Sequence, residues 1–161
     1  MRLCQTSSWD RAIVSELTPG IESLRILDVG CATGRLLCKL AEAGARHLSG
    51  VDLAPRIIDV ALQKLRDHGF EAELKSADVE VRVPWPHSWF DVVTLTGVLH
   101  HFFRPDDAVC EINRVLRCNG RIIIVDRGFR RCSGLWSTSI FGSFPMTVIA
   151  TSIHRPMSLK C

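Results

Sequence analysis

Apolar positions along the chain follow the period of a strand in some stretches and the period of a helix in others. Residues 24–29 (LRILDV) form an apolar run typical of a buried strand, and residues 35–43 (RLLCKLAEA) place apolar residues at helical spacing. Residues 46–51 (RHLSGV) predict a second strand, and Pro55 suits the first turn of the next helix. The apolar stripe of that helix consists of Ile57, Ile58, Ala61, Leu62 and Leu65.

The next two strands differ in their polarity. Residues 70–75 (FEAELK) alternate strictly between apolar and charged positions. Charges on a strand discourage edge-to-edge pairing, so we expect this strand at an edge of the sheet. Residues 89–95 (WFDVVTL) are more uniformly apolar and predict a central strand.

Charges mark the ends of the following helix. Pro105 begins it, acids occupy its first turn at 106–107, and Arg114 and Arg117 suit its last turn, where they complement the helix dipole. We expect Asn119-Gly120 to end this helix before a fifth strand over residues 121–126 (RIIIVD).

Alternating strands and helices predict a mainly parallel sheet covered by helices on both faces. With the third strand at an edge, the order is 3-2-1-4-5, which is the α/β fold of a three-layer Rossmann-like sandwich. Ligands of such sheets bind beyond the carboxyl ends of the strands, where the strand order reverses. Here that point lies between the first and fourth strands.

Small residues connect the first strand to its helix in the segment Asp28-Val-Gly-Cys-Ala-Thr-Gly34. Gly30, Ala32 and Gly34 allow a tight turn close to a ligand, and the helix that follows presents free N–H groups. Asp52 ends the next strand, at the distance where an acid binds ribose hydroxyls in nucleotide-binding α/β folds. These features predict an adenosine-containing cofactor.

The turn departs from the fingerprints of other nucleotide sites. Dinucleotide-binding turns carry glycine at the third and sixth positions, where this chain has Ala32 and Arg35, and no Gly-Lys-Ser/Thr follows. A nucleotide-dependent oxidoreductase is therefore disfavoured. The methyl group of Ala32 is tolerable only if that residue avoids a positive φ.

Three sequence blocks resemble the class I S-adenosylmethionine-dependent methyltransferases, and most closely their broad small-molecule group called type 11. The blocks are ILDVGCATGRLLCKLAEAGARHLSGVDLAPRIIDVALQKL, SADVEVRVPWPHSWFDVVTLTGVLHHF and EINRVLRCNGRIIIVD. The resemblance implies a cofactor-binding core over residues 24–127, with S-adenosyl-L-methionine as cofactor. Residues 1–23 would be an N-terminal helical segment with a helix over 8–18, and residues 128–161 a short C-terminal tail.

The resemblance implies roles for residues near the methionine part of the cofactor. Asp28 would organise the turn and approach the amino group. Gly30, Ala32 and Gly34 would pass under the methionine part, and the backbone carbonyl of Thr96 would meet its ammonium.

It also implies an adenosine-binding set. Asp52 would hold both ribose hydroxyls, and Leu53 would pack on the adenine. Asp78 would recognise the adenine amino group, with Val79 beside the ring. A structural alternative stays open for the acids, since Asp28 and Asp52 could be helix caps or surface acids and Asp78 a turn residue.

The catalytic residues are not identified by the sequence. Methyl transfer from a sulfonium needs positioning more than acid–base chemistry, and a general base only where the acceptor must lose a proton. His100 and His101 follow the fourth strand and are candidates for a base or substrate contact, or for a structural role at the cofactor rim. No spacing of Cys and His suggests a metal site, and no Asn-Pro-Pro-aromatic motif suggests a nucleic-acid base as target.

Charge and cysteine content add little to this assignment. The 161 residues carry a net charge of +3, but the chain from 113 onward holds eight Lys or Arg and one acid, so this part is basic. Seven scattered cysteines and an N-terminus without an export-type apolar segment favour a cytoplasmic protein.

The tail leaves several alternatives open. The resemblance implies a final antiparallel hairpin, which is missing or incomplete here, so the outer edge of the fifth strand would be uncovered and could form a homodimer. Residues 132–153 lack charge over 22 positions but include eight Ser or Thr, which favours a substrate lid or partly disordered segment over a membrane contact. The shortened chain would thus be either a methyltransferase for a small-molecule acceptor or a catalytically weak relative that binds the cofactor and acts through a partner.

Overall fold

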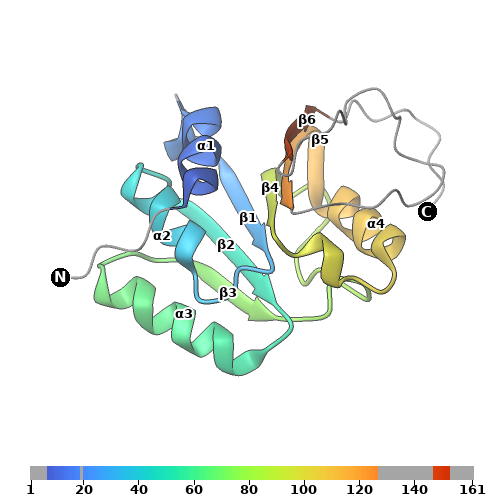
Figure 1. Cartoon of the computed structure of the whole chain (residues 1–161), viewed down its shortest axis with the longest axis horizontal. Coiled ribbons are helices and arrows are strands. Elements are labelled where there is room, and N and C mark those ends of the chain that lie inside the picture. Colours follow the sequence, from blue (N-terminus) through green and yellow to red (C-terminus); the bar gives the residue numbers. More distant parts are fainter. Residues whose placement is uncertain (1–6, 19, 127–146, 153–161) are drawn as a thin grey trace.

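The computed structural model describes residues 7–18 and 20–126, together with the backbone of 147–152. Its centre is a six-stranded sheet in the order β3-β2-β1-β4-β5-β6, in which β1 to β5 are parallel and β6 is antiparallel to β5 (Figure 1). The strands are β1 (Arg25–Val29), β2 (His47–Asp52), β3 (Glu73–Ser76), β4 (Phe90–Thr96), β5 (Leu116–Asp126) and β6 (Thr147–Ser152).

Helices cover the sheet on both faces, as alternating elements require. They are α1 (Ser8–Leu17), α2 (Arg35–Glu42), α3 (Pro55–Asp67) and α4 (Pro105–Val115), with the short 3₁₀ helices η1 (Ile21–Ser23) and η2 (Leu99–His101). Ile26 packs in one buried cluster with side chains of α1, α2 and α3, whereas its neighbour Leu27 packs in a second cluster with side chains of α4. Successive strand residues point to opposite faces, so β1 contributes to both layers of the core.

The predicted sheet order 3-2-1-4-5 is confirmed, and so is the edge position of the third strand. That strand begins at Glu73, three residues later than predicted. The backbone N–H of Phe70 donates to the Leu65 carbonyl at 2.9 Å, and Gly69 has a φ of 74°. Phe70 therefore belongs to the C-terminal end of α3 rather than to the sheet.

The predicted end of α4 is wrong. Asn119-Gly120 does not terminate the helix, because α4 ends at Val115 and β5 begins at once with Leu116. The backbone N–H groups of Ser88 and Trp89 donate hydrogen bonds to the last two carbonyls of the helix, those of Arg114 and Val115, at 2.9 and 2.7 Å. These tertiary hydrogen bonds replace the expected turn.

Asn119 and Gly120 instead lie in an irregularity within β5. Phe90 pairs with Leu116 and Val92 with Arg121, so the pairing register shifts between them. Asn119 has a φ of 64°, and a Cβ at position 120 would lie 2.6 Å from Leu116 Cγ. Arg117 consequently lies in a strand, where it pairs with Asp91, and not in the last turn of a helix.

The expectation of an uncovered fifth strand is also wrong. Residues 121–126 of β5 pair with 147–152 of β6, from Arg121↔Ser152 to Asp126↔Thr147. This side of β5 is therefore occupied within the chain, and the predicted homodimer contact through it would have to displace β6. Strand β6 is one antiparallel strand of the two-stranded hairpin that the resemblance implied.

The prediction for residues 132–153 falls mostly outside the described residues. Within it, residues 147–152 form β6. None of the helices in the described ranges is long and apolar enough to cross a membrane.

Candidate cofactor-binding site

The turn after β1 is held at the carboxyl edge of the sheet by backbone hydrogen bonds. The N–H groups of Gly30 and Cys31 donate to the Val51 carbonyl at 2.8 and 3.1 Å, and Gly34 donates to Cys31 at 2.9 Å. Gly30 has a φ of 69°, and a Cβ there would lie 2.5 Å from Val98 Cγ2. Only glycine lets the turn close against the loop that follows β4.

Ala32 corrects the expectation made for it. Its φ is 45°, so the condition set for tolerating its methyl group, a φ that is not positive, is not met. This conformation costs an alanine about 1–2 kcal/mol relative to glycine. The Ala32 N–H donates to Asp52 Oδ2 at 3.0 Å, a contact that helps to hold the residue in this conformation.

The Asp52 carboxylate connects the turn after β1 to the loop that follows β2. Besides the contact to Ala32, its Oδ1 accepts the N–H of Ala54 at 3.1 Å. Leu53 beside it is 70% exposed, which is unusual for a large apolar residue and leaves a free apolar surface. The sequence predicted this acid and this apolar neighbour at one rim, and the structure brings both there.

The end of β3 and the residues that follow it lie beside Asp52. The N–H of Ala77 donates to the Asp52 carbonyl at 3.1 Å, and Ser76 Oγ to the Leu53 carbonyl at 3.1 Å. Asp78 is exposed and its Oδ1 accepts the Glu80 N–H at 2.9 Å, as in the turn alternative. Val79 is buried in the cluster that also holds α4.

Asp28 is the most perturbed acid of the site. It is 3% exposed within β1, and Thr94 Oγ1 of β4 donates to its Oδ1 at 2.8 Å. Burial raises the pKa of Asp28 to about 7, because desolvation outweighs the Thr94 hydrogen bond and the nearby Arg35 guanidinium. Two further acids, Asp10 and Asp52, act in the same direction as burial.

Thr96, at the end of β4, carries an unpaired polar atom. Its hydroxyl oxygen is buried and has no hydrogen-bond partner among the residues that the structure describes. Gly97 next to it has a φ of 65°, and its N–H donates to the Val125 carbonyl at 2.7 Å. The unpaired hydroxyl thus lies at the carboxyl end of β4, on the same side of the sheet as the glycine turn.

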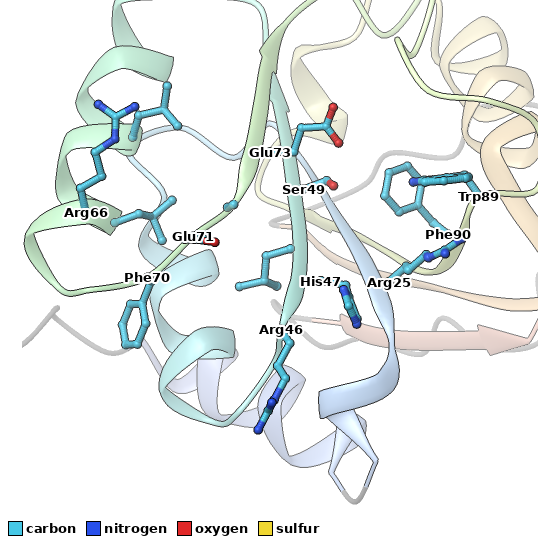
Figure 2. Close-up of a pocket in the computed structure, with 14 residues that line it drawn as sticks. Arg25, Arg46, His47, Ser49, Arg66, Phe70, Glu71, Glu73, Trp89 and Phe90 are labelled. Atoms are coloured by element: carbon cyan, nitrogen blue, oxygen red, sulfur yellow. The ribbon is translucent and has the colours of Figure 1, made fainter.

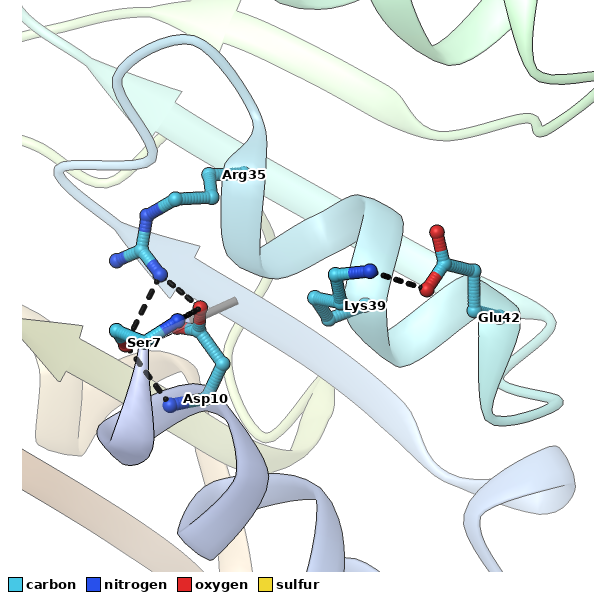
Figure 3. A network of polar contacts seen from close by, with 5 residues as sticks. All are labelled: Ser7, Asp10, Arg35, Lys39 and Glu42. Atoms are coloured by element: carbon cyan, nitrogen blue, oxygen red, sulfur yellow. Dashed lines mark hydrogen bonds and ion pairs between the residues drawn. The ribbon is translucent and has the colours of Figure 1, made fainter. Parts of the chain in front are cut away.

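Arg35 points away from the turn and binds the N-terminal helix (Figure 3). Its Nη1 donates to Ser7 Oγ at 3.1 Å and forms an ion pair with Asp10. Asp10 is completely buried and also closes a capping box with Ser7 at the start of α1. The sequence placed Arg35 correctly after the turn but gave no indication of its partner, which lies 25 residues earlier.

His100 has a partner that the sequence analysis missed. His100 Nδ1 lies 2.7 Å from Asp126 Oδ1, and its backbone N–H donates to Asp126 Oδ2 at 3.3 Å. Asp126 ends β5 and is 7% exposed. The rings of His100 and His101 are tilted by 41° to each other, with centroids 4.0 Å apart. A buried acid at the carboxyl end of β5 is the signal that would have identified this pair.

A cavity of about 630 Å³ lies at the amino ends of the strands, on the side of the sheet opposite the glycine turn (Figure 2). Its lining includes Arg25, His47, Glu73 and Phe90, each of which begins its strand. Arg25 also stacks on Trp89, with 4.3 Å from the guanidinium carbon to the ring centroid. None of the predicted site residues lines this cavity, so it is distinct from the rim formed by the glycine turn.

The fold defines a Rossmann-like α/β protein, and comparison with known proteins narrows this class. Residues 27–124 match the family described as a methyltransferase domain, so the chain belongs to that family. It is 33% identical over 103 residues to a demethylmenaquinone methyltransferase of Thermus thermophilus, covering 63% of this chain and 46% of the relative. It is 30% identical over 113 residues to a ubiquinone biosynthesis O-methyltransferase of Aromatoleum aromaticum, covering 69% of this chain and 48% of the relative.

Solved structures agree with this family. The crystal structure of YcgJ from Bacillus subtilis is 27% identical, with a TM-score of 0.68, over 73% of this chain and 50% of that one. A SAM-dependent methyltransferase from Aquifex aeolicus has a TM-score of 0.67 at 20% identity, covering 78% of this chain and 67% of that one, and supports the fold alone. The chain spans about half the length of the curated relatives it matches, at 46% and 48%.

Proposed function

We propose that this protein is an S-adenosyl-L-methionine-dependent methyltransferase that acts on a small-molecule acceptor, with residues 24–127 as its cofactor-binding core. The main support is that the turn over residues 30–34, Asp52 and Asp28 lie together at the carboxyl ends of β1 and β2. Relatives named for quinone and sterol methylation support the class of acceptor. The cytoplasmic location stays a prediction.

The residues present fit this cofactor at both of its ends. Near the methionine part, the buried carboxyl of Asp28, ionised above its pKa of about 7, would provide a negative charge for the amino group, and the backbone carbonyl of Thr96 would accept a hydrogen bond from it. At the ribose end, each carboxylate oxygen of Asp52 accepts one backbone N–H, at 3.0 and 3.1 Å. Each oxygen keeps a second lone pair that can accept a ribose hydroxyl. Leu53, and Asp78 with Val79, would lie along the adenine.

The bound cofactor would supply an activated methyl group on a sulfonium sulfur. The chain's own contribution is positioning, since a displacement in line requires the nucleophile, the methyl carbon and the sulfur to be aligned. Hydrogen bonds to the Val51 carbonyl hold the turn over residues 30–34 in place, and Val98 of the loop after β4 packs against Gly30. This turn would support the methionine part of the cofactor and so help to align its methyl group.

Calorimetric titration with S-adenosylmethionine tests this function together with Asp52→Ala. The wild-type chain should bind, whereas Asp52→Ala should lose at least tenfold in affinity because two hydrogen bonds to the ribose are removed. Asp59→Ala is the matched control, since Asp59 is an exposed acid on α3, and it should bind as the wild type does. NADH should give no heat.

Two results would contradict the proposal. Absence of heat with S-adenosylmethionine would exclude the cofactor, and equal affinity of Asp52→Ala and Asp59→Ala would exclude the ribose role of Asp52. Circular dichroism of each variant checks that the fold is retained.

A further inference from the structure

His100 and Asp126 form a hydrogen-bonded pair at the rim where the cofactor would bind. Asp126 Oδ1 lies 2.7 Å from His100 Nδ1, and the second carboxylate oxygen accepts the His100 backbone N–H at 3.3 Å. The side chain of Asp126 is 4% exposed and that of His100 is 45% exposed. One partner is thus held in the protein and the other is open to solvent.

The pair lies beside the glycine turn. His100 follows Val98 by two residues, and Val98 Cγ2 occupies the space that a Cβ on Gly30 would need. The bond from the Gly97 N–H to the Val125 carbonyl, at 2.7 Å, holds the end of β4 against the residue preceding Asp126. The loop after β4 therefore connects the exposed ring of His100 to the place proposed for the methionine part.

The hydrogen bond determines which ring nitrogen can act. A carboxylate only accepts hydrogen bonds, so a neutral His100 paired with Asp126 carries its proton on Nδ1. The lone pair then lies on Nε2, at the far side of the ring from the buried acid. Such an orienting acid and exposed imidazole are the arrangement of a general base.

We propose that His100 is the general base of methyl transfer, that Asp126 is its positioning residue, and that the acceptor carries a phenol-type hydroxyl group, which presupposes the methyltransferase function proposed above. His100 Nε2 takes the hydroxyl proton as the oxygen forms a bond to the methyl carbon. The bond from that carbon to sulfur breaks, and sulfur keeps the electron pair. The products are an aryl methyl ether, the neutral thioether and a protonated His100, which returns its proton to water.

The chemistry of a lone imidazole base selects this acceptor class. A neutral amine already has a lone pair for attack, and a carboxylate has already lost its proton, so neither requires a base. A phenol ionises near pH 10, within reach of an imidazole, whereas an aliphatic alcohol is far less acidic. Among oxygen and nitrogen acceptors, a phenol-type hydroxyl is therefore the group whose methylation this pair would assist.

The tautomer of His100 tests the pair without any acceptor. We expect long-range ¹H–¹⁵N spectra of the ¹⁵N-histidine-labelled chain at alkaline pH to show His100 protonated at Nδ1. Asp126→Asn should populate the other tautomer, since an amide can donate as well as accept. An Nε2-protonated His100 in the wild type, or a tautomer that Asp126→Asn does not change, would overturn the pair.

Methyl transfer tests the base and the acceptor. The wild-type chain with labelled S-adenosylmethionine should methylate a hydroxyl among catechol, 4-hydroxybenzoate and 3,4-dihydroxybenzoate. His100→Gln should lower kcat by about 10²- to 10⁴-fold with unchanged affinity for S-adenosylhomocysteine. His87→Gln is the control, because His87 is an exposed histidine in the connection before β4 and should retain the wild-type rate.

The remaining outcomes separate this inference from the proposed function. A chain that binds S-adenosylmethionine but methylates aniline, or none of the three phenols, would overturn the acceptor class. Undiminished transfer by His100→Gln, or a loss confined to His101→Gln, would overturn the base. Absence of cofactor binding would instead contradict the proposed function itself.

Discussion

Asp28→Asn should stabilise the protein while weakening its binding of the cofactor. Burial raises the pKa of Asp28 from 3.8 to about 7, so the folded protein keeps a proton that the unfolded chain releases between these values. The unfolded state binds fewer protons there, and stability therefore falls as pH rises from about 4 to about 7. Below pH 4 both states are protonated and Asp28 costs nothing.

The expected size follows from this shift. Each pH unit corresponds to about 1.4 kcal/mol, so ionised Asp28 lowers the free energy of unfolding by up to roughly 4 kcal/mol at pH 8. Asparagine remains neutral, and its side-chain oxygen can accept the Thr94 hydroxyl that now binds Oδ1 at 2.8 Å. Allowing for relaxation around the site, we expect a gain of about 2–4 kcal/mol at pH 8 and almost none at pH 4.

Urea unfolding followed by circular dichroism between pH 4 and 8 measures this gain. Asp59→Asn is the control, since this exposed acid on α3 should show no comparable pH dependence. The reasoning is refuted if Asp28→Asn is less stable than the wild type at pH 8, or if the difference does not grow with pH. Calorimetry at pH 8 should show the variant binding S-adenosylmethionine at least tenfold more weakly, because the carboxylate that faces a cationic group is gone.

Three other substitutions test the turn and its support. Gly30→Ala should destabilise by about 2 kcal/mol and abolish cofactor binding, since its φ is 69° and its Cβ would lie 2.5 Å from a methyl group of the loop after β4. Gly44→Ala is the control for backbone strain alone, because Gly44 has a φ of 101° but a Cβ there would meet nothing within 4 Å. An equal loss of stability in the Gly30 and Gly44 variants would contradict a steric clash between residue 30 and Val98. Ala32→Gly should raise the melting temperature, because relieving the φ of 45° recovers about 1–2 kcal/mol while the greater freedom of glycine in the unfolded chain offsets up to about 1 kcal/mol. A lower melting temperature would show the strain to be absent. Arg35→Ala should cost about 2–3 kcal/mol because it leaves Asp10 buried without its cation, and adding Asp10→Asn should recover part of that loss in urea unfolding.

Local periodicity was sufficient to predict the order of elements and the edge position of β3. Strand β1 is buried on both faces and reads as an apolar run, whereas β3 is more exposed and alternates between apolar and charged residues. The pattern of apolar positions therefore predicts which strand faces are buried. The end of α4 was not predictable in this way. It depends on Ser88 and Trp89, whose backbone N–H groups reach the helix from before β4.

Long-range polar contacts were the other gap. Arg35 meets Asp10 across 25 positions, and His100 meets Asp126 across 26, so neither pair shares a local motif. The site acids were easier to place, because Asp28 and Asp52 lie in the last residues of two neighbouring parallel strands, whose carboxyl ends are on the same side of the sheet. Topology alone predicted where they lie, and only the fold revealed which groups they bind.

The central claim is that S-adenosylmethionine binds at the carboxyl edge of the sheet, and amide chemical-shift mapping tests it most directly. Titration of the ¹⁵N-labelled chain with S-adenosylhomocysteine should shift the amides of residues 30–34, 52–54, 78–80 and 96–100. The amides of His47, Arg66 and Glu71, which line the cavity at the opposite edge, should stay in place. Shifts confined to that cavity, or no shifts at saturating ligand, would contradict the account.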